Sequence, residues 1–275
     1  MVLINRKLGG ILNYRVAFFP DPATVRTFTE NLKSTEFGGL FYTAVDLPEL
    51  PSVLRHESHA TALTNLKDGP EAVWQVLNKS ARQGIRQIEK IPDRARVGLN
   101  TDRIIDDFLP LFNEFAASKD GVKAISRSVL DRYGDKIDIF VAYLDGTPMC
   151  GHIMLRDDDT SRARLLYSAS RRLTDPAVAT MCGSLNRYLH WHEIGAYREK
   201  GFATYDWGGL DDDESNGIRR FKLSFGGTIV NEHTYLCAGS PWLGRLGLGI
   251  SSALKGRGRR QPQMSPSTTP APEPK

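Results

Sequence analysis

Apolar residues recur along this chain with two different periods. Between residues 70 and 91 they recur every three or four positions, which predicts a helix that ends before Pro92. Further on, three runs rich in β-branched and aromatic residues change to a period of two, which predicts strands. These runs are 137–144, 148–155 and 163–170. Asp145-Gly146 joins the first two and predicts a tight hairpin turn.

The remaining elements follow from the same two periods. Further strands are predicted at 59–66, 97–99, 203–207 and 228–236, and further helices at 102–115, 125–133, 177–200 and 215–225. The predicted order is therefore β-α-β-α-α-β-β-β-α-β-α-β. Because three antiparallel strands are followed by a crossover helix and another strand, the sequence predicts a mixed α/β sheet.

The chain divides into three predicted segments. Residues 1–58 hold apolar pieces around a helix near 22–34, and are expected to form a partial α/β segment packed on the main domain. Residues 59–240 form that main domain. Residues 241–275 are basic and rich in Pro and Ser, and have little apolar content after Arg260, so most of this tail is expected to be disordered.

The net charge of +4 belongs to the tail. Residues 243–275 carry six cations and one anion, so the rest of the chain carries a charge of −1. A DNA-binding surface over the whole protein is therefore not predicted. Because the three cysteines are far apart and residues 1–13 lack an apolar signal segment, we expect free thiols in a cytoplasmic protein.

The start of the tail combines apolar and cationic residues. Trp242 and several aliphatic residues precede Lys255, Arg257, Arg259 and Arg260. This combination allows a weak peripheral contact with an anionic membrane surface. The alternative is that residues 242–254 pack on the main domain and the remainder is a passive linker.

The predicted helix at 70–91 carries a stripe of cations. Lys79, Arg82, Arg86 and Lys90 are spaced by three or four residues, so their side chains share one side of the helix. Only two acidic residues are available on this helix, and an unpaired cationic stripe suits an anionic group such as a phosphate. The alternative is an ordinary solvated helix face.

The stretch 203–227 is the most informative in the chain. Its strand ends at Asp206-Trp207 and meets Gly208-Gly209, where the backbone can approach a bound molecule closely. The alternative, without a functional role, is a tight helix docked between two strands.

The helix within this stretch is predicted to begin at Ser215. Its apolar face is expected to consist of Ile218, Phe221 and Phe225. Cationic side chains point elsewhere; these are Arg219, Arg220 and Lys222.

Four sequence segments carry a resemblance to a known family. They are WQVLNKSARQGIRQIEK, LNRYLHWHEIGAYREKG, YDWGG and RRFKLSFGG. Together they resemble the Fem-type branch of the GNAT acyltransferase superfamily, which includes peptidoglycan interpeptide-bridge aminoacyltransferases and acetyltransferase-like relatives. The resemblance covers about residues 59–237. It implies a GNAT fold with a sheet splayed in its middle, where an amine attacks an acyl ester or thioester directly.

The resemblance also implies roles for particular residues. Lys222 would stabilise negative charge on the donor or intermediate, and Asp206 would orient the acceptor or act as a base. Tyr167 is a weaker candidate for a polar contact in the cleft. The candidate substrate-binding and phosphate-binding residues are Arg82, Arg86, Arg171, Arg172, Arg219, Arg220, Gly208 and Gly209.

The acyl donor stays open between an acyl-CoA and an aminoacyl-tRNA. Members that use acetyl-CoA carry a glycine-containing loop before the long helix, which cradles pyrophosphate, whereas residues 171–176 contain no glycine here. Many Fem-type proteins carry two GNAT domains and a helical hairpin that contacts tRNA, whereas this chain has room for one complete domain and part of another.

The sequence therefore predicts an acyltransferase that moves an acetyl or aminoacyl group onto an amine. The acceptor is a small molecule or a lipid-linked molecule, such as a cell-envelope precursor. Two alternatives remain: an acetyl-CoA-dependent N-acetyltransferase of a small molecule or protein, and a non-catalytic GNAT-like binding module. No metal site is predicted, because His190 and His192 lie about 200° apart around their helix.

Overall fold

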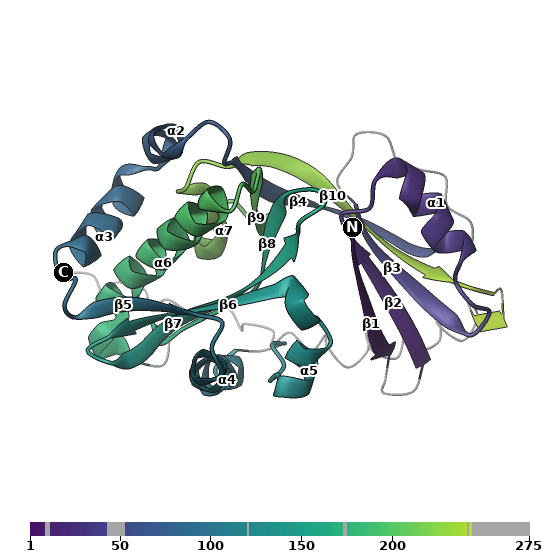
Figure 1. The fold of residues 1–275 in the computed structure, drawn as a ribbon, viewed down its shortest axis with the longest axis horizontal. Coiled ribbons are helices and arrows are strands. Elements are labelled where there is room, and N and C mark those ends of the chain that lie inside the picture. Colours follow the sequence, from purple (N-terminus) through teal and green to yellow (C-terminus); the bar gives the residue numbers. More distant parts are fainter. Residues whose placement is uncertain (9–11, 43–52, 120, 173–174, 241, 244–275) are drawn as a thin grey trace, which may run out of the picture.

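The computed structural model describes residues 1–8, 12–42, 53–119, 121–172, 175–240 and 242–243. Within these residues, ten strands form one mixed sheet in the order β1-β2-β3-β10-β4-β9-β8-β7-β6-β5. Figure 1 shows two lobes, and the long strands β4 and β10 run from one to the other. The predicted mixed α/β sheet is confirmed.

The elements of the larger lobe follow the predicted order closely. The strands are β4 (Val53–Asn65), β5 (Ala95–Leu99), β6 (Ile137–Leu144), β7 (Thr147–Asp157), β8 (Arg162–Ser170), β9 (Thr204–Gly209) and β10 (Thr228–Ala238). The α-helices are α2 (Pro70–Val76), α3 (Lys79–Glu89), α4 (Asp102–Ala117), α5 (Arg127–Asp131), α6 (Ala179–Glu199) and α7 (Gly217–Leu223). The turn at Asp145-Gly146 has positive φ at both residues, as the hairpin signal predicts.

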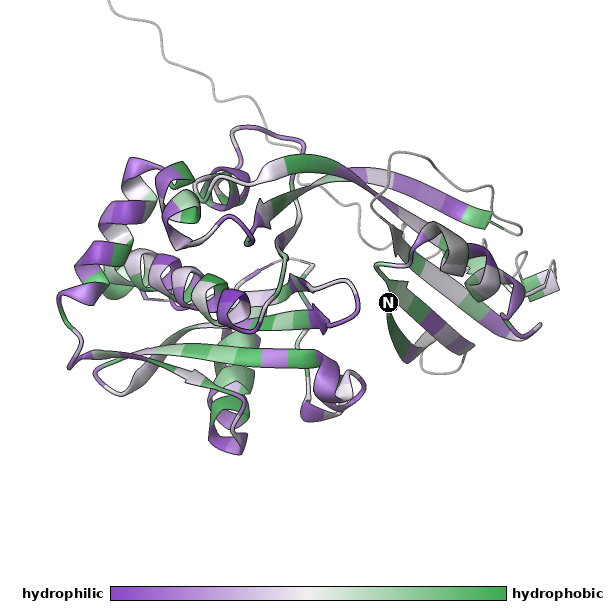
Figure 2. Ribbon diagram, turned by 45° about the horizontal axis from the view of Figure 1, so that its top comes forward, coloured by the Kyte–Doolittle hydropathy of each residue, from purple (hydrophilic) through white to green (hydrophobic). Residues whose placement is uncertain are grey.

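Helices cover both faces of this part of the sheet. On one face α6 packs on the strands and α3 packs on α6, and the core there includes Ile85, Leu185 and Trp207. On the other face α4 packs on β6, β7 and β8, around Phe108 and Phe112. Figure 2 shows hydrophobic positions along the strands of this lobe and mixed positions along its helices. The predicted amphipathic pattern therefore accounts for its layers.

The helix predicted at 70–91 is two helices. Leu77 is extended, with a ψ of 137°, and ends α2. Asn78 then caps α3, because its side chain accepts a hydrogen bond from the backbone N–H of Ala81. The backbone N–H of Asn78 donates to the carbonyl of Ser224, far along the chain. The single predicted helix is therefore wrong at this point, and a tertiary contact accompanies the break.

The N-terminal residues form the smaller lobe. It contains β1 (Val2–Leu8), β2 (Leu12–Phe18), α1 (Pro22–Glu30) and β3 (Glu36–Tyr42), and β3 pairs with β10. The sequence predicted apolar segments in this region but did not predict strand β1. The segment boundary placed at residue 58 falls inside β4, which continues from this lobe into the larger one.

Strands β8 and β9 separate after a short paired segment. They pair in parallel only from Arg162 opposite Thr204 to Arg164 opposite Asp206, whereas β8 pairs with β7 to its last residue. The sheet is therefore splayed between β8 and β9, as predicted. The candidate site lies at this divergence.

The predicted tail lies mostly outside the described residues, because only positions 242 and 243 of it are described. Leu243 is buried against Phe37 and Ala238, whereas Trp242 is 53% exposed. Among the described helices, none is both long enough and apolar enough to cross a membrane.

Candidate functional site

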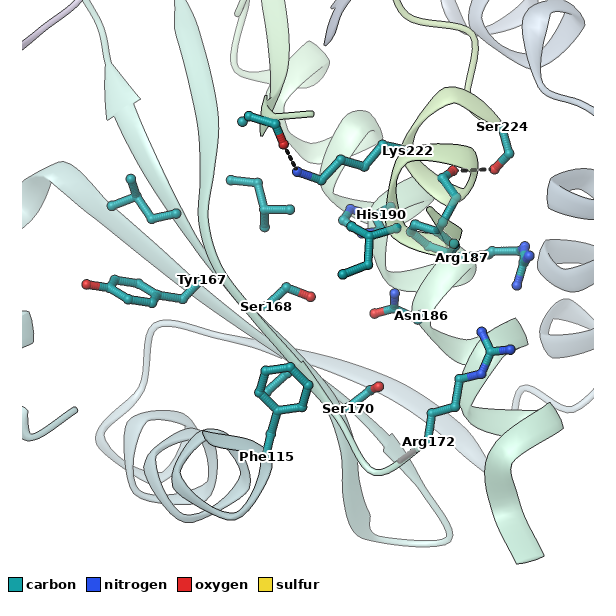
Figure 3. A pocket seen from close by; sticks show the side chains of 18 of the residues that line it. Phe115, Tyr167, Ser168, Ser170, Arg172, Asn186, Arg187, His190, Lys222 and Ser224 are labelled. Atoms are coloured by element: carbon teal, nitrogen blue, oxygen red, sulfur yellow. Dashed lines mark hydrogen bonds between the residues drawn. The ribbon is translucent and has the colours of Figure 1, made fainter. Parts of the chain in front are cut away.

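A cavity of about 1140 Å³ lies where β8 and β9 separate. Its walls are the diverging half of β8, the first half of α6, the end of β9, and α7. Figure 3 shows polar side chains from β8 and α6 facing this space, including Ser168, Ser170 and Asn186. The splay in the sheet therefore produces a concave site with polar groups around it.

The charged groups around the cavity are all cationic. Among the described residues that line it, none is Asp or Glu. The cations are Lys119, Arg164, Arg172, Arg187, Arg220 and Lys222. Such a lining favours an anionic ligand, since guanidinium and ammonium groups are strong donors to phosphate and carboxylate oxygens.

Lys222 extends from α7 to the glycine pair at the end of β9. Its Nζ donates a 2.7 Å hydrogen bond to the carbonyl of Gly209. Burial, assisted by the charge of Arg164 and opposed by that of Asp206, lowers the pKa of Lys222 to about 8. Gly208, with a φ of +67°, and Gly209 also line the cavity. The structure therefore brings Lys222 together with both predicted glycines.

Asp206 lies beneath the cavity and does not line it. Its side chain is fully buried and accepts hydrogen bonds from Arg162 at 2.7 Å, Arg164 at 3.2 Å, Thr61 at 2.9 Å and the backbone N–H of Gly208 at 2.9 Å. A carboxylate held by two guanidiniums and two further donors has no free face for an acceptor. The expectation that Asp206 contacts the acceptor or acts as the base is therefore not met by its position.

Two arginines meet near the start of α6. Arg172 lies in the cavity wall, and Arg187 reaches from α6 toward it (Figure 3). Burial, with the charge of Arg172 as the second cause, lowers the pKa of Arg187. The buried Nε of Arg187 has no hydrogen-bond partner among the described residues. Two like charges held close together favour an anion between them.

Arg171, in contrast, points out of the cavity. Its guanidinium lies 3.7 Å from a carboxylate oxygen of Glu114, and it does not line the cavity. Arg219 also lies outside, where it donates to the carbonyl of Asp211. Of each adjacent arginine pair, only the second, Arg172 or Arg220, reaches the cavity.

Tyr167 reaches the cavity wall with its ring rather than its hydroxyl. The ring packs edge-on against Phe112, at 5.4 Å between centroids. In Figure 3 the hydroxyl of Tyr167 points away from Lys222 and His190. Its position supports packing against α4 more than a contact with the reacting groups.

The basic stripe of α3 does not reach the cavity. Arg82 donates to carbonyls at the end of α2, with 3.2 Å to Gln75, and Arg86 stacks over Trp74 at 5.4 Å. Neither residue lines the cavity. The stripe is used to join α3 to α2, so the expectation that Arg82 and Arg86 meet the phosphates of a substrate in this cavity is not met.

Two details of α7 also differ from the sequence prediction. The helix is capped by Asn216, whose side chain accepts from the N–H groups of Ile218 and Arg219, whereas Ser215 bonds to Asp213. Ile218 is 58% exposed at the cavity mouth, so it does not share a buried face with the buried Phe225.

Three residues of α6 were missed as site candidates. Asn186, Arg187 and His190 share one face of the helix by their spacing and line the cavity. The cluster is visible in the sequence as polar residues on the inward side of a long helix. Its signal was weak because the same turns also carry buried leucines.

Comparison with known proteins gives one family match. The family model described as an acetyltransferase (GNAT) domain matches residues 77–223, which is more than half of the chain. A search of curated proteins finds no significant match.

Several solved structures share the fold at low sequence identity. FemX has a TM-score of 0.60 and 12% identity, covering 84% of this chain and 83% of that chain. The C-terminal domain of a putative lysylphosphatidylglycerol synthetase from Agrobacterium fabrum has a TM-score of 0.54 and 14% identity, covering 92% and 84%. L-PGS from Bacillus licheniformis has a TM-score of 0.53 and 11% identity, covering 94% and 86%.

Proposed function

Because this chain belongs to the GNAT acetyltransferase family and is an acyltransferase, we propose that its cavity binds a phosphate-bearing acyl donor. The acyl group of this donor is transferred there to an amine acceptor. The observation that carries the proposal is the cavity lining, which combines six cations with no carboxylate among its described residues. A donor with phosphate groups is matched by this lining, and an acyl ester or thioester would lie beside Lys222.

Lys222 is the proposed stabiliser of negative charge. Attack by the amine nitrogen forms a C–N bond and moves the carbonyl electron pair onto oxygen, which becomes an oxyanion. An ammonium group has three N–H donors, and Lys222 uses one on Gly209. The other two can meet the oxyanion within a partly buried cavity, where such contacts are stronger than in water.

Asp206 acts in this proposal as a positioning residue. It holds the N–H of Gly208 and the guanidiniums of Arg162 and Arg164 where β8 and β9 part. Removing it would leave two buried cations with fewer partners. Its effect on transfer therefore runs through the geometry of the glycine pair that Lys222 contacts.

Arg172 and Arg187 are the proposed phosphate-binding residues. Arg172 precedes α6 and Arg187 projects from it, and both guanidiniums line the cavity. An acyl-CoA and an aminoacyl-tRNA both carry phosphates, and a transfer assay with each donor distinguishes between them.

The proposed acceptor is an amine of a cell-envelope precursor. The support is the likeness in fold to FemX and to domains named for lysylphosphatidylglycerol synthetase. A lipid-linked acceptor also gives a role to the cationic tail, which we propose makes weak contact with anionic membranes from the cytoplasmic side. Co-sedimentation with anionic vesicles at low salt tests that contact, and a chain ending at residue 239 is its control.

The test is a transfer assay with two labelled donors, acetyl-CoA and lysyl-tRNA. The acceptor is a UDP-linked muropeptide with a free amine, and binding of each donor is followed in parallel by thermal shift. We expect a labelled amide from one of the two donors. Binding without transfer would favour the non-catalytic binding module, and absence of both binding and transfer would contradict the proposed donor class.

A further inference from the structure

A buried polar cluster lies behind the cavity wall formed by α6. His152 of β7, His190 and Glu193 of α6, and Tyr205 of β9 are each at most 1% exposed. His190 is the member that lines the cavity. The cluster therefore links the cavity to the core of the sheet.

The hydrogen bonds fix where the protons lie. Tyr205 donates from its hydroxyl to Glu193 at 2.5 Å, so that hydroxyl has no proton left for another acceptor. The Nδ1 of His190 lies 2.8 Å from the same hydroxyl oxygen and 3.3 Å from a Glu193 oxygen. Both neighbours act as acceptors there, so Nδ1 carries the proton. In the neutral ring, Nε2 is then the bare nitrogen.

Glu193 is held ionised by its surroundings. Although burial opposes ionisation, the charge and hydrogen bond of His152, at 2.7 Å, together with His190, lower the pKa of Glu193 to about 2. The charge of Glu193, behind the protonated Nδ1, partly offsets the burial that disfavours imidazolium at His190.

The same residues have the types and spacing of a metal set. The ligand atoms of His152, His190 and Glu193 all lie within 4.8 Å of one another. However, the Nδ1 of each histidine is already used on Glu193 or Tyr205, and Nε2 of His152 contacts Asn186 at 2.9 Å. Hydrogen bonds therefore already occupy these atoms, and the arrangement favours proton transfer over metal binding.

We propose that His190 is the base that takes the proton of the attacking amine. This inference rests on the proposed function. As the amine nitrogen bonds to the acyl carbon, its N–H proton moves to Nε2 of His190. When the acyl bond to the ester oxygen or thioester sulfur breaks, the leaving atom takes that proton back. The imidazole ends neutral, and the net products are an amide and the protonated leaving group.

The groups around His190 set its resting state. They are His152, Glu193, Tyr205 and, across the cavity side, Lys222. Burial, followed by the charges of His152 and Lys222 and opposed by Glu193, lowers the pKa of His190 to about 4. The imidazole is therefore neutral, with Nε2 able to accept, throughout the range near neutral pH.

The kinetic test replaces His190 by Gln and, as control, the exposed His192 of the same helix by Gln. With acetyl-CoA or lysyl-tRNA as donor, His190→Gln is expected to lower kcat by about 10²–10⁴-fold with little change in the KM for the donor. His192→Gln is expected to retain the wild-type kcat. A kcat for His190→Gln within about threefold of wild type would overturn the proposal.

A second measurement needs no variant to fold. Histidine labelled with ¹⁵N in the wild-type protein reports the tautomer of each ring by NMR. For His190 we expect a protonated Nδ1 and an unprotonated Nε2 at neutral pH. A protonated Nε2 at neutral pH would also overturn the proposal. If the wild-type protein transfers neither donor, the proposed function fails instead, so the two failures remain distinct.

Discussion

Lys222 donates its 2.7 Å hydrogen bond to the carbonyl oxygen of Gly209, the last residue of β9. This contact joins α7 to the end of β9, beyond Asp206, where β9 has already left β8. It also holds the ammonium group in the cavity wall, with two N–H donors that bond to none of the residues the structure describes. The splay in the sheet and the placement of the charge are therefore produced by the same local geometry.

Replacing Lys222 by Ala is expected to lower turnover much more than stability. If the ammonium stabilises an oxyanion in a partly buried cavity, its loss costs on the order of 3 kcal/mol of barrier, or about 100-fold in kcat. Steady-state kinetics and thermal unfolding measure the two effects, and Lys90→Ala, at the exposed residue that follows α3, is the matched control. Near-normal turnover of Lys222→Ala would remove Lys222 from the catalytic set.

The pH profile gives an independent reading of the same residue. Because the pKa of Lys222 is about 8 and the donating form is protonated, kcat is expected to decline as pH rises through about 8. Lys222→Arg keeps the charge at every accessible pH, so the decline near pH 8 should disappear. A decline that persists unchanged in Lys222→Arg would belong to another group.

Replacing Asp206 by Asn tests a positioning role against the role of base. The carboxylate contacts Arg162 and Arg164, so the change leaves buried cations short of a partner and is expected to cost about 3–5 kcal/mol of stability. The residual activity should keep the wild-type pH profile. A profile that loses its acidic limb only in this variant would restore the base role to Asp206.

Periodicity predicted most of the larger lobe because its elements bury one face each. The strands of 137–170 and the helix at 177–200 need only local patterns to be recognised, and they occur within a few residues of the predicted bounds. The break at Asn78 could not be predicted, because it involves a contact with Ser224 that the local pattern does not contain. Strand β1 could not be recognised by period, because Val2, Leu3 and Ile4 are all apolar and only the structure shows that Leu3 is exposed.

The sequence predicted those site residues that lie close together in one short motif. Lys222 and the two glycines share one short stretch, and all reach the cavity. Asp206 differs because its partners Arg162 and Arg164 come from another strand, and only the pairing of β8 with β9 shows that they enclose it. The cationic stripe and the family resemblance also placed Arg82 and Arg86 in the site, although Arg82 donates to carbonyls of α2 and Arg86 stacks over Trp74.

Two pairs of arginines are expected to differ in function: Arg172 and Arg187 bind phosphate, whereas Arg82 and Arg86 pack α3 against α2. Replacing both Arg172 and Arg187 by Gln is expected to weaken binding of acetyl-CoA or lysyl-tRNA at least tenfold, and to reduce the salt dependence of that binding. Replacing both Arg82 and Arg86 by Gln is the matched control, with wild-type affinity expected. Affinities would be measured by calorimetry over a range of salt concentrations. A stronger loss in the control pair would place the donor phosphates on α3.

Glu232 of β10, which binds Arg164 of β8, is expected to make the stability of the fold sensitive to acid. Although burial opposes ionisation, the hydrogen bond from His59 and the charge of Arg164 lower the pKa of Glu232 from 4.5 to about 2. A carboxyl with a depressed folded pKa contributes stability that is present above its unfolded pKa and is lost as pH falls from about 4.5 toward about 2.

Unfolding free energies measured in urea between pH 7 and pH 3 test this contribution. The wild-type value should fall with pH, and Glu232→Gln should begin lower, because Arg164 loses a charged partner, but fall less steeply. Glu57→Gln, at an exposed carboxylate on β4, keeps the same change in side chain and should retain the wild-type slope. Parallel slopes for wild type and Glu232→Gln would show that protonation of Glu232 does not drive the loss, and would assign it to the other buried carboxylates, such as Glu193, whose pKa is also lowered to about 2.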